Sequence, residues 1–179
     1  MSIDWIILDK IQSLFSGGFM DWLMPKITIL GDAGMIWIII GIVLLLSKKH
    51  RKIGFLVLFG LLMGLIIGNG LVKNLVARPR PCWINRELKL LIEVPKDYSF
   101  PSGHTQASVI AATIITLYRK EWGWIVIPLA VFIAFSRLYL YVHFPTDVLG
   151  GAVMGLVIGL VTYFAGNKII NTMIVKKQK

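Results

Sequence analysis

Apolar residues in this chain gather into long runs, and charged residues mark the ends of most of these runs. A helix needs about 20 mostly apolar residues to cross a bilayer. Five runs approach or reach this length, and Arg137 lies near the end of the fourth. They cover residues 33–47, 53–72, 101–118, 122–142 and 148–167. Each run predicts a transmembrane helix.

The first 32 residues follow a different pattern. Residues 2–16 place their apolar side chains on one helical face, which predicts an amphipathic helix lying in the membrane interface. Residues 18–31 form a short sixth segment interrupted by Asp21, Pro25 and Lys26. A signal peptide is not expected, because acidic residues replace its basic start and no small-residue cleavage site follows. The pattern predicts an all-α, polytopic membrane bundle of about six transmembrane helices with an N-terminal amphipathic helix.

Composition supports a membrane protein. Of the 179 residues, 56% are hydrophobic and 16% are charged, and the mean hydropathy is +0.76. A soluble domain of this size has too little interior to hide so much apolar surface. No linker or low-complexity tract divides the chain, so residues 1–179 are expected to form a single domain. The single cysteine, Cys82, excludes an intrachain disulfide, a cysteine-based zinc site and an iron–sulfur cluster.

The net charge of +10 comes largely from three clusters. Basic residues gather at 48–52, at 119–120 and from 168 to the end of the chain. The predicted crossings place these clusters on one side, which the positive-inside rule makes cytoplasmic. Six crossings then put both termini in the cytoplasm and the segments 73–100 and 137–147 outside. Because most of the charge excess is an orientation signal of a plasma-membrane protein, nucleic acid is not an expected partner; the expected partners are the bilayer and a lipid.

Three polar clusters stand at the predicted outer ends of the apolar runs. They read KNLVARPRP at 73–81, PSGH at 101–104 and SRLYLYVHFPTD at 136–147. Taken singly, each has a structural explanation, because cations at helix ends reach to head groups and a lone histidine is often structural. Together they bring two of the three histidines, several cations and an acid to one membrane face. That convergence favours a functional site.

The cations of these clusters predict an anion site. They are Lys73, Arg80 and Arg137. Arginine donors match phosphate oxygens in pairs. Residues 102–104 begin a predicted helix, so their backbone N–H groups can point at the same phosphate, helped by the Ser102 hydroxyl. Gly103 allows close backbone approach. The sequence therefore predicts a phosphate-binding site.

The histidines suggest how a bound phosphate would react. His143 precedes Asp147 by four residues, a spacing that lets the carboxylate accept a hydrogen bond from one ring nitrogen and leaves the other as a nucleophile. His104 is then available as general acid and base. These roles predict phosphoryl transfer through a phosphohistidine, without a cofactor. A divalent metal on these residues is not expected, because the surrounding cations would repel it.

At these residues the sequence resembles the type 2 phosphatidic acid phosphatase (PAP2) superfamily of membrane lipid phosphatases. Its three signatures stand here as Lys73 with Arg80-Pro81, as Pro101-Ser102-Gly103-His104, and as Ser136-Arg137 with His143 and Asp147. The resemblance implies a six-span bundle that hydrolyses lipid phosphates or pyrophosphates at the extracytoplasmic face without a metal. It makes His143 the nucleophile, Asp147 its partner and His104 the general acid and base, and it makes Lys73, Arg80, Ser102, Gly103 and Arg137 phosphate binders.

The resemblance leaves the lipid open. The short chain looks like the bacterial branch, whose typical substrates are undecaprenyl pyrophosphate, phosphatidylglycerol phosphate and phosphatidic acid. Arg78 is outside the signatures and is expected to contact a head group or substrate. A lipid transporter or scramblase and a non-catalytic phospholipid-binding protein are the alternatives. A transporter would carry its ionisable residues near the midplane, and a scaffold would not need the two histidines.

Overall fold

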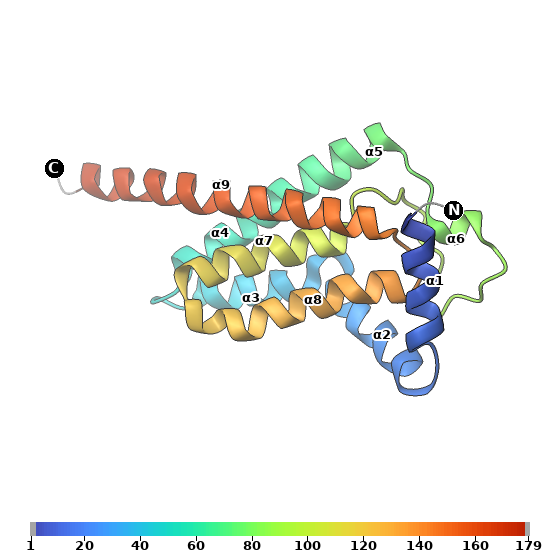
Figure 1. Ribbon diagram of the computed structural model, residues 1–179. Coiled ribbons are helices and arrows are strands. Elements are labelled where there is room, and N and C mark those ends of the chain that lie inside the picture. Colours follow the sequence, from blue (N-terminus) through green and yellow to red (C-terminus); the bar gives the residue numbers. More distant parts are fainter. Residues whose placement is uncertain (1–2, 178–179) are drawn as a thin grey trace.

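The structure, a computed structural model, describes residues 3–177, and in that part of the chain it contains helices and no strand (Figure 1). The α-helices are α1 (Ile3–Phe15), α2 (Gly18–Gly31), α3 (Met35–Leu46), α4 (Arg51–Gly64), α5 (Lys73–Val76), α6 (Pro81–Ile84), α7 (Gly103–Tyr118), α8 (Gly123–Tyr139) and α9 (Pro145–Lys177). Short 3-10 turns cover Asp32–Gly34 and Lys120–Trp122, and a π-helix covers Leu65–Val72. The predicted all-α fold is confirmed.

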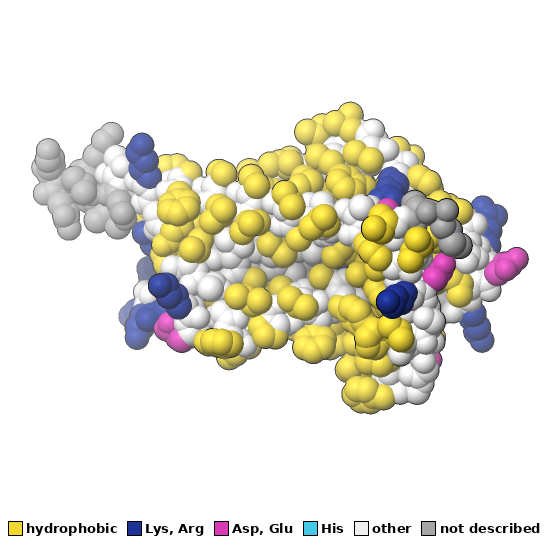
Figure 2. Space-filling view, viewed as in Figure 1, with side chains coloured by type: hydrophobic (Ala, Val, Ile, Leu, Met, Phe, Trp, Pro, Cys, Tyr) yellow, Lys and Arg dark blue, Asp and Glu magenta, His cyan; other side chains and the backbone are white. Residues whose placement is uncertain are grey.

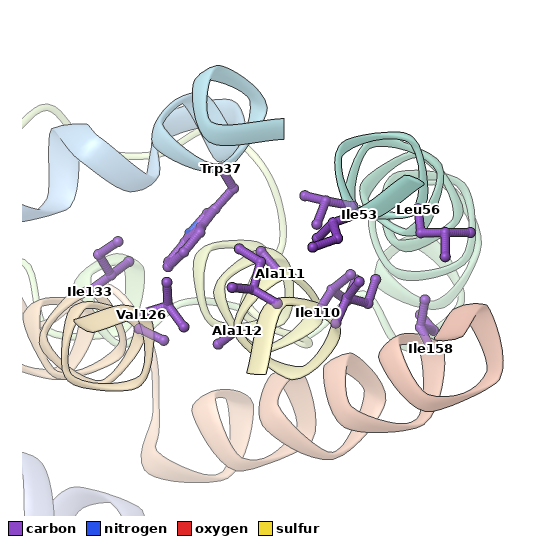
Figure 3. Close-up of a cluster of buried hydrophobic side chains, with 13 residues drawn as sticks. Trp37, Ile53, Leu56, Ile110, Ala111, Ala112, Val126, Ile133 and Ile158 are labelled. Atoms are coloured by element: carbon purple, nitrogen blue, oxygen red, sulfur yellow. The ribbon is translucent and has the colours of Figure 1, made fainter. Parts of the chain in front are cut away.

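Helix α7 is the centre of the bundle and packs against α4, α8 and α9. The main core draws apolar side chains from five helices, including Trp37 of α3, Ile110 of α7 and Ile133 of α8 (Figure 3). The indole N–H of Trp37 donates to Ser108 Oγ at 2.9 Å, so the buried nitrogen has an acceptor. Small residues bring α9 close to α7: a Cβ on Gly155 would lie 2.7 Å from the carbonyl oxygen of Gln106.

The outside of the bundle suits a lipid environment. Four helical segments are long and apolar enough to cross a membrane. They are Gly18–Leu46, Arg51–Ile84, Lys120–Tyr139 and Pro145–Ile170. Figure 2 shows hydrophobic side chains along the flank of the bundle and Lys and Arg side chains gathered at its two ends. The chain is a multi-pass membrane protein.

The two basic loops meet at one end of the bundle, as predicted. The ring of His50, in the loop between α3 and α4, lies 5.1 Å from the ring of Trp122, in the loop between α7 and α8. The described part of α9 also ends on this side (Figure 1). We call this end, which carries the loops 47–50 and 119–122, the basic end.

The structure does not confirm the predicted six crossings. Residues 18–31 and 33–47 belong to one candidate membrane segment, Gly18–Leu46, in which α2 and α3 follow one another and are broken at Asp32–Gly34. The 14 residues of α2 span about 21 Å at 1.5 Å per residue, less than the 30 Å of a hydrocarbon core. Helix α1 lies at the end of the bundle opposite the basic end (Figure 1), and the membrane side of each terminus stays a prediction.

Candidate active site

The predicted site residues meet in one cavity at the end of the bundle opposite the basic end. The cavity has a volume of about 760 Å³. Six of the predicted residues line it: Lys73, Arg80, Gly103, His104, Arg137 and His143. Its walls also include the apolar residues Ile38, Leu58, Leu61, Leu62 and Leu65 of α3, α4 and the π-helix. Charged and apolar side chains therefore line the same cavity.

Arg80 is the central cation of the site and is only 2% exposed. Its Nη1 donates to the carbonyl oxygen of Val142 at 2.7 Å and lies 3.0 Å from His143 Nε2. Its Nε donates to the carbonyl oxygen of Asp97 at 2.7 Å. Pro81 follows as the first residue of α6, which leaves Arg80 in extended backbone just before that helix. The side chain is held from three directions, so the charge has a fixed position.

His143 is buried, with 1% exposure, in the short connection between α8 and α9. A guanidinium group can only donate, so the contact with Arg80 makes Nε2 an acceptor and places the ring proton on Nδ1. Burial, followed by the nearby positive charges of Arg80 and Arg137, holds the pKa of His143 well below its usual range. The imidazole is neutral, and Nε2, which faces the cations, carries the lone pair.

Asp147 lies in the first turn of α9 and is fully buried. The predicted direct hydrogen bond to His143 is wrong in this structure, because Nδ1 and Oδ2 are 3.7 Å apart. Asp147 Oδ2 instead accepts from Ser99 Oγ at 2.5 Å and from the backbone N–H of Phe144 at 2.8 Å. Ser99 Oγ also lies 3.4 Å from His143 Nδ1. Ser99 stands between the two predicted partners, and no spacing in the sequence pointed to it.

Ser102 caps the start of α7, as the PSGH pattern indicated. Its Oγ accepts from the N–H of Thr105 at 3.4 Å and from Thr105 Oγ1 at 3.0 Å. The prediction that the Ser102 N–H faces a phosphate is wrong, because this group donates to the carbonyl oxygen of Asp147 at 3.1 Å. The bond ties α7 to α9. A phosphate contact from the Ser102 hydroxyl stays a prediction.

Gly103 is crowded by a residue that the sequence pattern did not single out. A Cβ at this position would lie 2.9 Å from Asn69 Oδ1. Asn69 belongs to the π-helix, lines the cavity and has a buried Oδ1 without a partner. Because π-helices often occur at functional sites, a π-helix placed between α4 and Lys73 marks this wall as part of the candidate site.

Arg137 reaches the cavity from the last turn of α8 and is 4% exposed. Its Nη1 donates to Thr28 Oγ1 of α2. Its Nε is buried without a partner. An unpartnered buried N–H is costly, and an anion in the cavity would offer it an acceptor. The predicted role of Arg137 in phosphate binding stays a prediction.

His104, in the first turn of α7, contacts a carboxylate from the N-terminal part of the chain. Its Nε2 lies 2.8 Å from Asp32 Oδ1. Asp32 was not predicted as a site residue, since it was read only as the charge that ends an apolar run. Its place in Gly31-Asp32-Ala33-Gly34, between two glycines, is a signal that could have indicated a break in the helix.

Asp97 is a second carboxylate that the sequence did not assign to the site. It pairs with Lys73 Nζ at 2.5 Å and with Arg80 Nη2 at 2.7 Å. Burial alone would raise its pKa, but the hydrogen bond from Lys73 and the charge of Arg80 outweigh burial and lower the pKa of Asp97 to about 2. An ionised carboxylate thus pairs with both of these predicted phosphate-binding cations.

Arg78 does not line the cavity, and its expected contact with a head group or substrate stays a prediction. Its Nη1 donates to Asp147 Oδ1 at 2.5 Å, and its Nη2 donates to Asp4 Oδ2 of α1 at 2.7 Å. Asp4 also accepts from the backbone N–H of Thr146 at 3.1 Å. Arg78 therefore pairs with the buried carboxylate of Asp147 and links it to Asp4 of α1.

The relatives of this chain include enzymes that act on lipid phosphates by name. A protein named undecaprenyl-diphosphatase, from Sulfolobus acidocaldarius, is 35% identical over 121 residues, which cover 67% of this chain and 58% of that protein. A protein named phosphatidylglycerophosphatase B, from Bacillus subtilis, is 32% identical over 155 residues, which cover 79% of this chain and 66% of that protein. The matches thus span less than two thirds of the length of these relatives.

Two solved structures share the fold. LpxE of Aquifex aeolicus has a TM-score of 0.78 at 25% identity, with 90% of this chain and 95% of that chain covered. A PAP2-type phosphatidylglycerolphosphate phosphatase of Bacillus subtilis has a TM-score of 0.73 at 26% identity, with 93% and 85% covered. A family model described as the PAP2 superfamily matches residues 53–170. This range holds all three sequence signatures, and since it is well over half of the chain, the protein belongs to the PAP2 superfamily.

Proposed function

We propose that this protein is a membrane lipid phosphatase that hydrolyses a lipid phosphate or pyrophosphate through a phosphohistidine on His143. The contact between His143 Nε2 and Arg80 Nη1, 3.0 Å, carries the proposal. It places an unprotonated nitrogen beside the cation that a phosphate would bind. A phosphate on Arg80 would take over this donor and bring phosphorus next to the freed lone pair.

The first step forms the bond between His143 Nε2 and phosphorus while the bond from phosphorus to the leaving oxygen breaks. The cations Lys73, Arg80 and Arg137 stabilise the charge on the phosphoryl oxygens. His104, in its protonated form, gives its proton to the leaving oxygen. Ser99 and Asp147, on the other side of the ring, stabilise the positive charge that His143 gains.

The second step returns the enzyme to its starting state. His104, now neutral, takes a proton from a water molecule as the water oxygen attacks phosphorus and the bond to His143 Nε2 breaks. Inorganic phosphate leaves, and the proton stays on His104. This sequence uses side chains of the chain itself as acid, base and nucleophile.

The lipid classes we propose are undecaprenyl pyrophosphate, phosphatidylglycerol phosphate and phosphatidic acid. The apolar wall of the cavity suits a lipid chain, and two relatives are named for the first two classes. The basic end supports an orientation with the cavity on the extracytoplasmic face of the plasma membrane and the end of α9 in the cytoplasm. A reporter fused to the C-terminus and active only in the cytoplasm tests this orientation.

Release of phosphate from a panel of these lipids by purified protein in EDTA tests the proposal. We expect wild type to hydrolyse at least one lipid, and His143→Ala to lose more than about 10⁴-fold in kcat because the nucleophile is gone. His50→Ala is the matched control, since this histidine lies at the basic end. Activity that EDTA abolishes, or a His143→Ala variant as active as wild type, would overturn the mechanism.

A further inference from the structure

The contact between Asp32 and His104 joins two parts of the chain that are 72 residues apart. Asp32 Oδ1 lies 2.8 Å from His104 Nε2, and both residues line the cavity. Asp32 also lies outside residues 53–170, the range that the family model matches. The contact is therefore made by a residue outside that range, in the turn Asp32–Gly34 between α2 and α3.

The break between α2 and α3 is shaped to present this carboxylate. Ala33 has a φ of 50° and Gly34 a φ of 73°, so two successive residues adopt left-handed backbone. Such a conformation is unfavourable for alanine and persists where the surroundings impose it. The backbone of α2 also lies directly against the imidazole: a Cβ on Gly31 would be 2.7 Å from His104 Cδ2.

The charged groups around His104 indicate what the Asp32 carboxylate contributes. Burial of His104 and then the positive charges of Arg137 and Arg80 oppose a positive charge on the ring, and the contact with Asp32 favours it. To donate a proton, the His104 ring must first be protonated and therefore positively charged. The neighbouring cations oppose this charge. Asp32 supplies the compensating negative charge, and its side chain is 58% exposed where it lines the cavity.

We propose that Asp32 is a positioning residue for His104. It accepts a hydrogen bond from Nε2, stabilises the protonated ring and leaves Nδ1 as the nitrogen that exchanges protons with the leaving group and with water. The inference rests on the proposed function, because it assigns His104 the role of proton donor. It adds the residue that favours the charged form of this donor and orients its ring.

The effect of Asp32→Asn should depend on the leaving group. An alkoxide leaving from a lipid phosphomonoester needs a proton, whereas nitrophenolate leaving from p-nitrophenyl phosphate is stable without one. The ratio kcat/KM reports the steps up to departure of the leaving group. We expect Asp32→Asn to lower kcat/KM about 10- to 100-fold for the lipid phosphomonoester. For p-nitrophenyl phosphate we expect a change of less than about threefold.

Asp21→Asn is the matched control, because Asp21 is a carboxylate of the preceding helix α2 and accepts a hydrogen bond from Tyr139 Oη at 2.5 Å. It should show no dependence on the leaving group, and Asp32→Glu should restore part of the lost lipid activity. Equal losses on both substrates, or no loss, would overturn the role of Asp32. Failure of the proposed function shows separately, as activity that survives His143→Ala.

Discussion

His143 and His104 each lie next to an aspartate, but the two pairs differ in burial and in sequence separation. His143 and Asp147 are 1% and 0% exposed in their side chains and lie four residues apart. His104 and Asp32 are 17% and 58% exposed and lie 72 residues apart. A nucleophile gains from a rigid, dry setting that keeps it neutral, whereas a group that exchanges protons needs water within reach. The two pairs suit these different tasks.

Among the variants that test this comparison, Asp147→Asn is expected to have the largest effect on activity. The variant removes the negative charge behind His143 while keeping the shape, so kcat should fall about 10³- to 10⁴-fold. The loss should be similar for lipid and for p-nitrophenyl phosphate, unlike the loss in Asp32→Asn, because both substrates use the same nucleophile. Asp9→Asn, which removes an acceptor for Tyr141 Oη, is the control. A loss in kcat below about tenfold would mean that the pairing of His143 with Asp147 is not needed for activity.

Arg78→Gln should have the next largest effect. Asp147 is fully buried and loses a donor at 2.5 Å. An unsatisfied buried acceptor costs about 1–3 kcal/mol, which corresponds to about 5- to 150-fold in rate if the cost falls on the transition state. Steady-state rates on both substrates measure the loss. Arg86→Gln, on an arginine that donates to the carbonyl oxygen of Trp83, is the control. A loss confined to the lipid would indicate that Arg78 contacts the head group instead.

Asp97→Asn tests whether the cations beside His143 hold an internal anion at rest. Without this carboxylate on Lys73 and Arg80, inorganic phosphate should inhibit at about 3- to 10-fold lower concentration. With a pKa of about 2, Asp97 is ionised throughout the range from about pH 5 to 8, so the difference should be constant there. Glu93→Gln, which removes another charge from the cavity wall, is the control. Weaker inhibition by phosphate would contradict the prediction.

The smallest effect is expected from Asp4→Asn, which tests whether α1 contributes to the buried pair. Burial would raise the pKa of Asp4, but hydrogen bonds from Arg78 and Thr146 outweigh burial and lower it. A carboxyl group with a lowered pKa stabilises the fold above its usual pKa of 3.8 and loses this contribution as the pH falls through its folded value. The variant should be about 1 kcal/mol less stable at pH 7.

Thermal midpoints in detergent at neutral and acid pH measure this difference. Wild type and Asp4→Asn should converge as the pH falls below 3.8 and through the lowered pKa of Asp4, because Asp4 then becomes protonated. Lys10→Gln, a change elsewhere on α1, is the control. A difference that persists unchanged at acid pH would show that the charge of Asp4 is not the cause.

Several features of the site followed from local sequence. The PSGH pattern predicted a helix that begins near Ser102, and the apolar run predicted that it ends at Tyr118. Helix α7 has Ser102 as its N-cap and ends at Tyr118. The contacts made by Ser99 and Asn69 did not follow from sequence. Neither residue lies at a diagnostic spacing, and each matters only because another segment packs against it. Arg78 was assigned to the substrate for the same reason: its charge was visible, but its partners, Asp147 and Asp4, were not.

The sequence by itself determined the membrane class, the helices that enclose the site and the clustering of its cations and histidines. These properties depend on hydrophobic period, on helix start signals and on spacings within one turn, which are all local. The tertiary structure decided which carboxylate each charged group meets: Asp97 on Lys73 and Arg80, and Asp32 on His104. It also decided at which end of the bundle α1 lies (Figure 1). These outcomes depend on how distant segments pack, and no local pattern carries that information.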